Sequence, residues 1–208
     1  MKILSLSVGP IMTNCYVLCD ETEKVCFVID PGDEADRVEQ LIASSGCTPQ
    51  GILLTHGHFD HCTGVAGLLL HYPELPVYIH PQDASDEMAG AYYMRFPRLP
   101  EKNQRYYREG DQLTLGSLTV TVMETPGHSQ GSVCLVVEDA IFSGDTLFRL
   151  SCGRTDLEGG DYKDMLRSLG RLGRLAGQYR VYPGHEEFTD LDTERDGNPY
   201  VQQGMQRF

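Results

Sequence analysis

Short apolar runs separated by turn-forming residues dominate the first eighty positions. Each run has the length of a strand, and Gly9-Pro10 is an example of the residues that break them. Strands are predicted at 2–8, 13–19, 24–30, 51–55 and 76–80. Between them, Val38, Leu41 and Ile42 recur at helical spacing, and a second helix is predicted to end near Tyr72.

The pattern after position 110 is strongly β and then helical. Strands are predicted at 111–115, 118–124, 132–137, 140–143 and 178–182. A helix capped by Asp161 precedes the last of these, and its apolar positions recur at helical spacing, as expected of a face buried in the core. The polar segment 190–208 is expected to end in a short helix.

The order of the elements predicts an α/β protein with two layers of sheet packed face to face and helices outside. No low-complexity linker separates the halves, so residues 1–208 are predicted to form a single domain. Residues 82–110 are rich in tyrosine and methionine and show no clear period. They are interpreted either as an insertion or lid beside a site, or as a surface packing segment.

Composition narrows the class of protein. No apolar run approaches the roughly 20 residues that span a bilayer, and the N-terminus is too short and mixed for a secretory signal, so a cytoplasmic protein without a membrane partner is expected. The net charge of −13 and the lack of a long basic run argue against a nucleic-acid partner. The seven cysteines form no Cys-x-x-Cys pair and are expected to be reduced.

The segment 55–61 combines candidate metal ligands at the end of a predicted strand. It contains His56, His58, Asp60 and His61, and a predicted helix follows. Ligands in α/β proteins are usually bound at such strand ends. Because imidazole and carboxylate suit zinc, iron and manganese, the segment predicts a metal site.

Three further residues share this placement. His128, Asp145 and His185 each follow an apolar run and have a glycine directly before them. Glycine permits the sharp turn and close backbone approach that a metal site needs. Seven candidate ligands are too many for one tetrahedral zinc, whereas they suit two metals with one bridging carboxylate. Two ions about 4 Å apart can hold a hydroxide between them.

Four motifs of this sequence resemble those of the metallo-β-lactamase fold superfamily, and most of all those of its glyoxalase II-like (hydroxyacylglutathione hydrolase-like) branch. They are His56-Gly57-His58-Phe59-Asp60-His61, Gly127-His128-Ser129, Gly144-Asp145-Thr146 and Pro183-Gly184-His185. The resemblance implies a four-layer αββα sandwich. It assigns His56, His58 and His128 to one metal, and Asp60, His61 and His185 to the other, with Asp145 bridging. Two zinc ions are the default, and iron or manganese also occur in such sites.

The resemblance implies a small-molecule thioester of the S-2-hydroxyacylglutathione type as substrate. A metal-bridging hydroxide would attack its carbonyl, with Asp60 and Asp145 as catalytic carboxylates that orient the hydroxide. Arg149 and Arg154 are candidates for binding a substrate carboxylate, and surface salt bridges are the alternative. Long-form glyoxalase II contacts glutathione through a helical C-terminal region with basic residues, and only Arg195 and Arg207 are basic after His185, so such contacts are not expected here. Ser151–Asp156 resembles a segment of short glyoxalase II-like proteins and persulfide dioxygenases.

Other interpretations remain open. The same motifs are found in persulfide dioxygenases, which use a single iron, and the same hydroxide could attack a lactone or another ester. A site that binds a metal or small molecule without turnover is a third alternative. Aspartate at 145 argues against an antibiotic-hydrolysing member of the family. Asp30 is interpreted as either a partner of a ligand imidazole or a turn cap. Cys62 and Cys152 lie beside the motifs, and no base that would activate them is evident. The sequence does not predict an oligomeric state.

Overall fold

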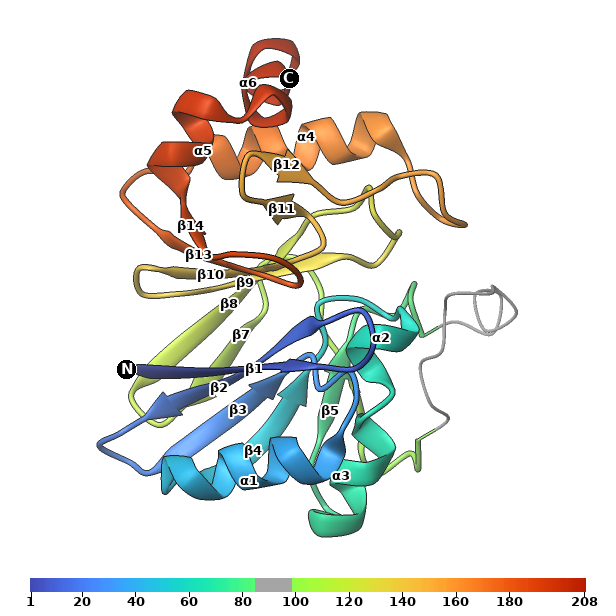
Figure 1. Cartoon of the computed structure of the whole chain (residues 1–208), viewed down its shortest axis with the longest axis vertical. Helices are drawn as coiled ribbons and strands as arrows, with labels where there is room; N and C mark the ends of the chain where they lie inside the picture. Colours follow the sequence, from blue (N-terminus) through green and yellow to red (C-terminus); the bar gives the residue numbers. More distant parts are fainter. Residues whose placement is uncertain (85–98) are drawn as a thin grey trace.

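The computed structural model describes residues 1–84 and 99–208, which contain two six-stranded sheets packed face to face (Figure 1). In spatial order, the first sheet consists of β1 (Lys2–Val8), β2 (Thr13–Asp20), β3 (Val25–Ile29), β4 (Thr48–Leu53), β5 (Val77–Ile79) and β6 (Gln104–Tyr106). The second consists of β14 (Thr189–Asp190), β13 (Arg180–Pro183), β10 (Ala140–Gly144), β9 (Val133–Val137), β8 (Leu118–Glu124) and β7 (Gln112–Leu115). A small hairpin joins β11 (Leu147–Phe148) to β12 (Ser151–Cys152).

Helices cover the outer face of each sheet (Figure 1). The first sheet is covered by α1 (Ala35–Ser45) and α3 (Val65–His71), and the short α2 (Phe59–Cys62) follows β4. The second sheet is covered by α4 (Tyr162–Gly173), α5 (Leu191–Gly197) and α6 (Pro199–Arg207). The predicted four-layer αββα arrangement is confirmed.

Alternating side chains explain why the strands form two central layers. Along β2, Val17 packs beneath the helices of its own sheet, whereas Tyr16 and Leu18 point into the space between the sheets. There Tyr16 meets Phe142 of the second sheet edge to face, with ring centroids 5.2 Å apart. Both faces of such a strand are buried, and each fully buried large apolar side chain contributes about 1.5–3 kcal/mol.

The helix predicted after Asp161 forms as expected. The Asp161 carboxylate accepts a hydrogen bond from the backbone N–H of Asp164 at 2.9 Å, which caps the first turn of α4. Met165 and Leu169 are fully buried against the outer face of the second sheet. The helix thereby fixes the sheet whose strand ends lead to His128, Asp145 and His185.

The structure differs from the sequence-based expectation in several places. The strand predicted at 51–55 is β4, which begins earlier, at Thr48, and ends at Leu53. Within the segment 82–110, which showed no period, β6 pairs in parallel with β5 and Tyr107 is buried. Residues 85–98, about half of the segment interpreted as a lid or a surface packing segment, lie outside the described residues. The C-terminal segment forms two helices instead of one, and β11, β12 and β14 were not predicted.

A polar edge strand explains the missed element. The residues of β6, Gln104-Arg105-Tyr106, are half-buried or exposed, so they carry no apolar alternation that a sequence pattern could reveal. Among the helices of residues 1–84 and 99–208, none combines the length and apolarity needed to cross a membrane.

Candidate metal centre

The seven candidate ligands come together where the ends of the two sheets meet. His56 and His58 follow β4, Asp60 and His61 lie in α2, and His128 lies in the loop between β8 and β9. Asp145 follows β10 directly, and His185 lies two residues after β13. Since β10 and β13 are parallel neighbours, their ends lie side by side, and the backbone N–H of Gly184 donates to the carbonyl of Gly144 at 2.8 Å.

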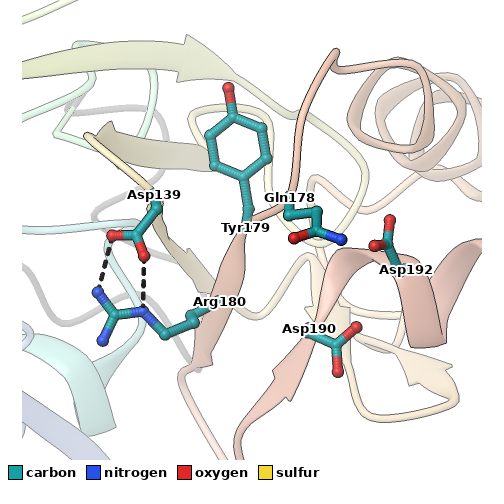
Figure 2. A pocket seen from close by; sticks show the side chains of 6 residues that line it. All are labelled: Asp139, Gln178, Tyr179, Arg180, Asp190 and Asp192. Atoms are coloured by element: carbon teal, nitrogen blue, oxygen red, sulfur yellow. Dashed lines mark hydrogen bonds and ion pairs between the residues drawn. The ribbon is translucent and has the colours of Figure 1, made fainter.

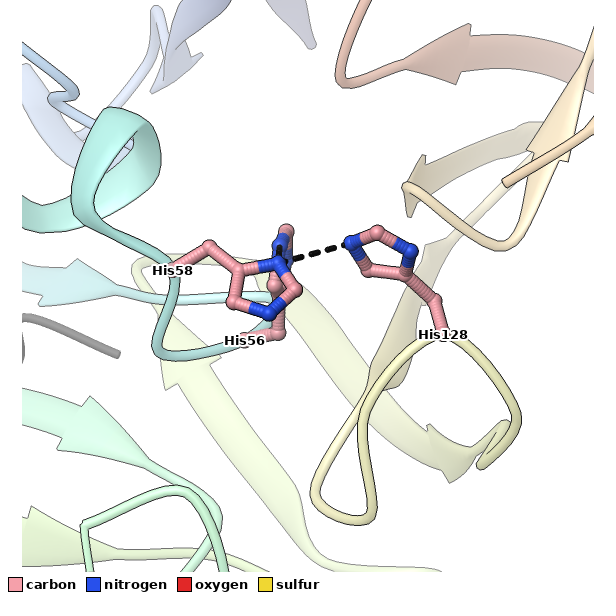
Figure 3. A group of neighbouring side chains, drawn as sticks. All are labelled: His56, His58 and His128. Carbon is pink, nitrogen blue, oxygen red and sulfur yellow. Dashed lines mark hydrogen bonds between the residues drawn. The ribbon is translucent and has the colours of Figure 1, made fainter. Parts of the chain in front are cut away.

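His56, His58 and His128 form what we call the three-histidine group (Figure 3). Nδ1 of His58 lies 3.0 Å from Nε2 of His56 and 2.8 Å from Nε2 of His128. All three side chains belong to buried residues. Ring nitrogens from two distant loops therefore converge on one point, as a metal ion requires of its ligands.

Asp60, His61 and His185 form a second cluster, the Asp60 group. Oδ2 of Asp60 lies 3.3 Å from Nε2 of His61 and 3.1 Å from Nε2 of His185. The His185 side chain is 20% exposed, while that of His61 is fully buried. The Asp60 group is thus open to solvent on its His185 side.

Asp145 lies between the two groups. Its Oδ1 is 3.3 Å from Nε2 of His61, and its Oδ2 is 3.5 Å from Nε2 of His128 and 3.6 Å from Nε2 of His185. One carboxylate therefore reaches donors from both groups.

Two buried atoms in this region fit a cation. Nε2 of His61 and Oδ1 of Asp145 make no hydrogen bond to any residue that the structure describes. A buried polar atom without a partner costs about 1–3 kcal/mol, so both atoms favour a ligand between them. Gly184 leaves room here, because a Cβ at this position would lie 2.3 Å from Oδ1 of Asp145. The residues present fit one or more divalent metal ions.

The pKa values of the candidate ligands depend on their surroundings. Burial lowers the pKa of His58 to about 3, and burial together with neighbouring imidazoles also lowers the pKa of His56. Burial alone would lower the pKa of His61, but the surrounding carboxylates, Asp145 foremost, raise it well above its usual range. Burial alone would raise the pKa of Asp145, but the imidazoles around it bring it down to about 2. At neutral pH the site therefore combines neutral imidazoles with ionised carboxylates and favours a positive charge near His61.

Asp30 orients one residue from each group, which favours the first of its two interpretations. Its Oδ2 accepts hydrogen bonds from Nδ1 of His61 at 2.9 Å and from the Thr55 hydroxyl at 2.6 Å. The Thr55 Oγ1 in turn lies 3.1 Å from Nδ1 of His56. These contacts leave the Nε2 atoms of His56 and His61 directed at the site.

Residues at the start of β2 hold the Asp60 group in place. The sequence pattern did not predict these contacts. The Thr13 hydroxyl donates to Oδ2 of Asp60 at 3.0 Å. The Asn14 side chain donates to the carbonyls of Pro183 and Glu186, at 3.1 and 3.0 Å, and its backbone N–H donates to the carbonyl of Gly184 at 2.7 Å. Asn14 thus binds the backbone on both sides of His185. Two polar residues at the start of a predicted strand were the only available signal.

The predicted substrate arginines lie on the surface in ion pairs. The Arg149 guanidinium donates to Glu187, and Arg154 forms a two-fold pair with Asp156, with both donor–acceptor distances 2.7 Å. The backbone carbonyl of Arg154 also lies 2.8 Å from Nδ1 of His128. The segment that carries Arg154 therefore adjoins the site, although its guanidinium already pairs with Asp156.

Neither nearby cysteine has the properties of a nucleophile. Burial raises the pKa of the Cys62 thiol well above its usual range and that of Cys152 to about 11. Both are therefore protonated at neutral pH, consistent with a site that relies on its histidines and aspartates.

A hollow of about 300 Å³ lies at the opposite end of β13 (Figure 2). None of the candidate ligands lines it. Its one arginine is already paired, because Arg180 makes two hydrogen bonds to the Asp139 carboxylate, at 3.1 and 2.7 Å. The Asp190 carboxylate caps α5 through the backbone N–H of Thr193. The histidine and aspartate cluster is therefore the better candidate for the functional site.

The fold and this cluster define an αββα protein with a His/Asp metal-binding site. The chain belongs to the metallo-beta-lactamase superfamily, whose family model matches residues 8–185. The fold and family inferred from the sequence motifs are thereby confirmed.

Sequence similarity to known proteins extends over most of the chain. The "Probable metallo-hydrolase YqgX" of Bacillus subtilis is 38% identical over 209 residues, covering 97% of this chain and 98% of that protein. A "Hydroxyacylglutathione hydrolase" of Hamiltonella defensa is 36% identical over 178 residues. That match covers 85% of this chain but only 64% of the relative.

Solved structures with the same fold differ in their described properties. "BLEG-1 B3 metallo-beta-lactamase" is 33% identical with a TM-score of 0.84, covering 96% of this chain and 99% of that one. "TTHA1623 in a di-iron-bound form" is 38% identical with a TM-score of 0.80, covering 95% and 99%. "ETHE1 from Myxococcus xanthus" is 30% identical with a TM-score of 0.80, covering 97% and 84%. Together these matches establish a metallo-hydrolase superfamily fold without singling out one substrate or metal.

Proposed function

We propose that this protein is a binuclear metal-dependent hydrolase of small-molecule thioesters, of the S-2-hydroxyacylglutathione type. The observation that carries the proposal is the position of Asp145, whose two oxygens face His61 on one side and His128 and His185 on the other. A carboxylate so placed is suited to bridge two metal ions, one in the three-histidine group and one in the Asp60 group. Zinc suits both donor sets, and iron or manganese are the alternatives.

Metal ions bound in these groups would polarise the thioester carbonyl and lower the pKa of a water molecule. Asp60 and Asp145 are the proposed catalytic carboxylates, since each can accept a hydrogen bond from that water and hold it in line with the carbonyl. The surrounding imidazoles keep the pKa of Asp145 low, at about 2, so it is ionised and can serve as an acceptor at neutral pH.

The preference for a thioester rests on relatives. A hydroxyacylglutathione hydrolase is 36% identical to this chain over 178 residues, which is 85% of the chain. Arg149 and Arg154 are the proposed contacts for a substrate carboxylate. Both guanidiniums are exposed, so a substrate could exchange with Glu187 or Asp156 at little cost.

The proposal is tested by elemental analysis of the isolated protein followed by assays with that metal. We expect two ions per chain and turnover of S-lactoylglutathione. His58→Ala should remove most of the activity, because it deletes a donor at the centre of the three-histidine group. A protein that retains two ions yet leaves S-lactoylglutathione and other acyl thioesters intact would overturn the proposal.

The same measurements separate the competing activities. One iron per chain and oxygen consumption with glutathione persulfide would instead indicate the persulfide dioxygenase reaction, and ETHE1 of Myxococcus xanthus is among the similar structures. A simple lactone and the β-lactam nitrocefin complete the panel, since a B3 metallo-beta-lactamase also shares the fold. Turnover of either one without turnover of thioesters would reassign the substrate class.

A further inference from the structure

We propose that Asp83 is a positioning residue that sets the spacing of the three-histidine group. The inference rests on the proposed function in one respect, namely that this group holds a metal ion. His56 and His58 belong to one loop and His128 to another, so their ring nitrogens converge only if the two loops are held together. Asp83, in the turn after β5, lies between these loops and contacts both.

The Asp83 carboxylate accepts hydrogen bonds from both loops. Oδ2 accepts from the backbone N–H of Gly57 at 2.9 Å and from the Ser129 hydroxyl at 2.7 Å. Oδ1 accepts from the backbone N–H of Gly131 at 2.7 Å. Gly57 lies between His56 and His58, and Ser129 directly follows His128. Each loop is therefore bound within one residue of its candidate ligands.

A carboxylate is the group best suited to this position. Three donors converge on it, and an ionised carboxylate only accepts hydrogen bonds, whereas an amide would turn its own NH₂ toward one of those donors. Asp83 is 2% exposed, so a donor left without an acceptor here could not turn to water instead. Asparagine would keep the shape of the side chain but lose at least one of the three contacts.

The loop that carries His128 is shaped to receive Asp83. A Cβ at position 131 would lie 2.6 Å from Oδ1 of Asp83, so glycine is needed for this close approach. The Ser129 hydroxyl also lies 2.7 Å from the hydroxyl of Ser132, which fixes its orientation toward the carboxylate. At the base of the loops, the backbone N–H of Val133 donates to the carbonyl of Thr55 at 2.8 Å. Asp83 thus supplies a link between the loops in addition to this backbone hydrogen bond.

The consequence is a three-histidine group that is assembled before an ion binds. Nε2 of His128 lies 2.8 Å from Nδ1 of His58. If one loop moved relative to the other, these two atoms would separate. The ion in this group should then bind more weakly. The Asp60 group should be less affected, because none of its residues lies in either loop.

The test compares Asp83→Asn with a matched control, Glu194→Gln. Glu194 is also a buried carboxylate with two N–H donors and one hydroxyl donor, from Leu150, Asn198 and Thr189, and it contacts no candidate ligand. Zinc affinity is measured by competition with a chromogenic chelator, and apo-protein melting temperature by calorimetry. Repeating the titration in a His185→Ala background isolates the three-histidine group.

Both variants should lower the apo melting temperature, but only Asp83→Asn should weaken zinc binding, by roughly ten- to hundredfold. Zinc affinity of Asp83→Asn equal to that of Glu194→Gln would overturn the inference and leave Asp83 as a structural residue. If Asp83→Asn fails to fold, Ser129→Ala decides, since it removes one contact and should weaken zinc binding by about fivefold. An unchanged affinity in Ser129→Ala would equally overturn it. The readout is metal affinity, so a protein that binds zinc but hydrolyses no thioester would refute the proposed function alone.

Discussion

Nε2 of His61 lies 3.3 Å from Oδ1 of Asp145, and neither atom makes a hydrogen bond within the described part of the chain. The other nitrogen of the His61 ring, Nδ1, is already hydrogen-bonded to the Asp30 carboxylate. The His61 ring is therefore held in one orientation, with its remaining nitrogen directed at Asp145. A cation between these atoms would satisfy both at once.

Metal removal should accordingly destabilise the fold as well as abolish hydrolysis. A ligand present at about a thousand times its Kd stabilises a protein by about 4 kcal/mol, which for a chain of this size corresponds to roughly 10 °C in Tm. Differential scanning calorimetry of chelator-treated protein, with and without added zinc, measures the effect. Equal Tm values in both samples would show that no ion binds in the folded state.

Asp30→Asn should impair both groups together, because Asp30 contacts His61 directly and reaches His56 through Thr55. The expected loss in kcat/KM is roughly ten- to hundredfold. Asp20→Asn is the matched control, since Asp20 is a buried carboxylate that binds Ser117 and contacts no candidate ligand. Steady-state kinetics should show the loss in the first variant alone. A comparable loss in Asp20→Asn would point to general destabilisation instead.

Asn14→Ala should weaken the binding of one metal ion and leave the binding of the other unchanged. Its side chain and backbone bind the carbonyls around His185, and only the side-chain contacts would be lost. The Asp60 group should therefore bind zinc more weakly, by up to about thirtyfold, which corresponds to two lost hydrogen bonds of about 1 kcal/mol each. A two-step zinc titration resolves the change, which should fall on one step and leave the other unchanged. Equal weakening of both steps would contradict this assignment.

Gly184→Ala should abolish most activity, because the added Cβ would lie 2.3 Å from Oδ1 of Asp145 and 2.7 Å from Cε1 of His61. One of these two side chains must then leave its position, so zinc content and kcat should fall together. Gly46→Ala provides the control: its φ is +71° and no atom lies within 4 Å of the added Cβ, so it should cost about 1 kcal/mol of stability without loss of activity. Full activity in Gly184→Ala would mean that this contact does not shape the site.

Asp60, the three-histidine group and the other candidate ligands could be predicted from sequence because each follows a short apolar run and a local turn. Such runs form strands largely for local reasons, and strand ends in this class of fold meet at one edge. The buried face of α4 was likewise evident from its spacing, with Met165 and Leu169 in the core.

Only the tertiary structure decided how these ligands are held. Thr13 reaches Asp60 across 47 residues, Asn14 reaches Pro183 across 169, and Asp83 meets Ser129 across 46. A single side-chain hydrogen bond to a distant partner leaves no period and no local motif, so it cannot be read along the chain. The polar edge strand β6 was not predicted for a related reason, since its position depends on backbone pairing with β5 and not on burial of its side chains. The periodic pattern of apolar residues determined the layers and the strand ends at which the candidate ligands lie, whereas unique long-range contacts determined the geometry of the site.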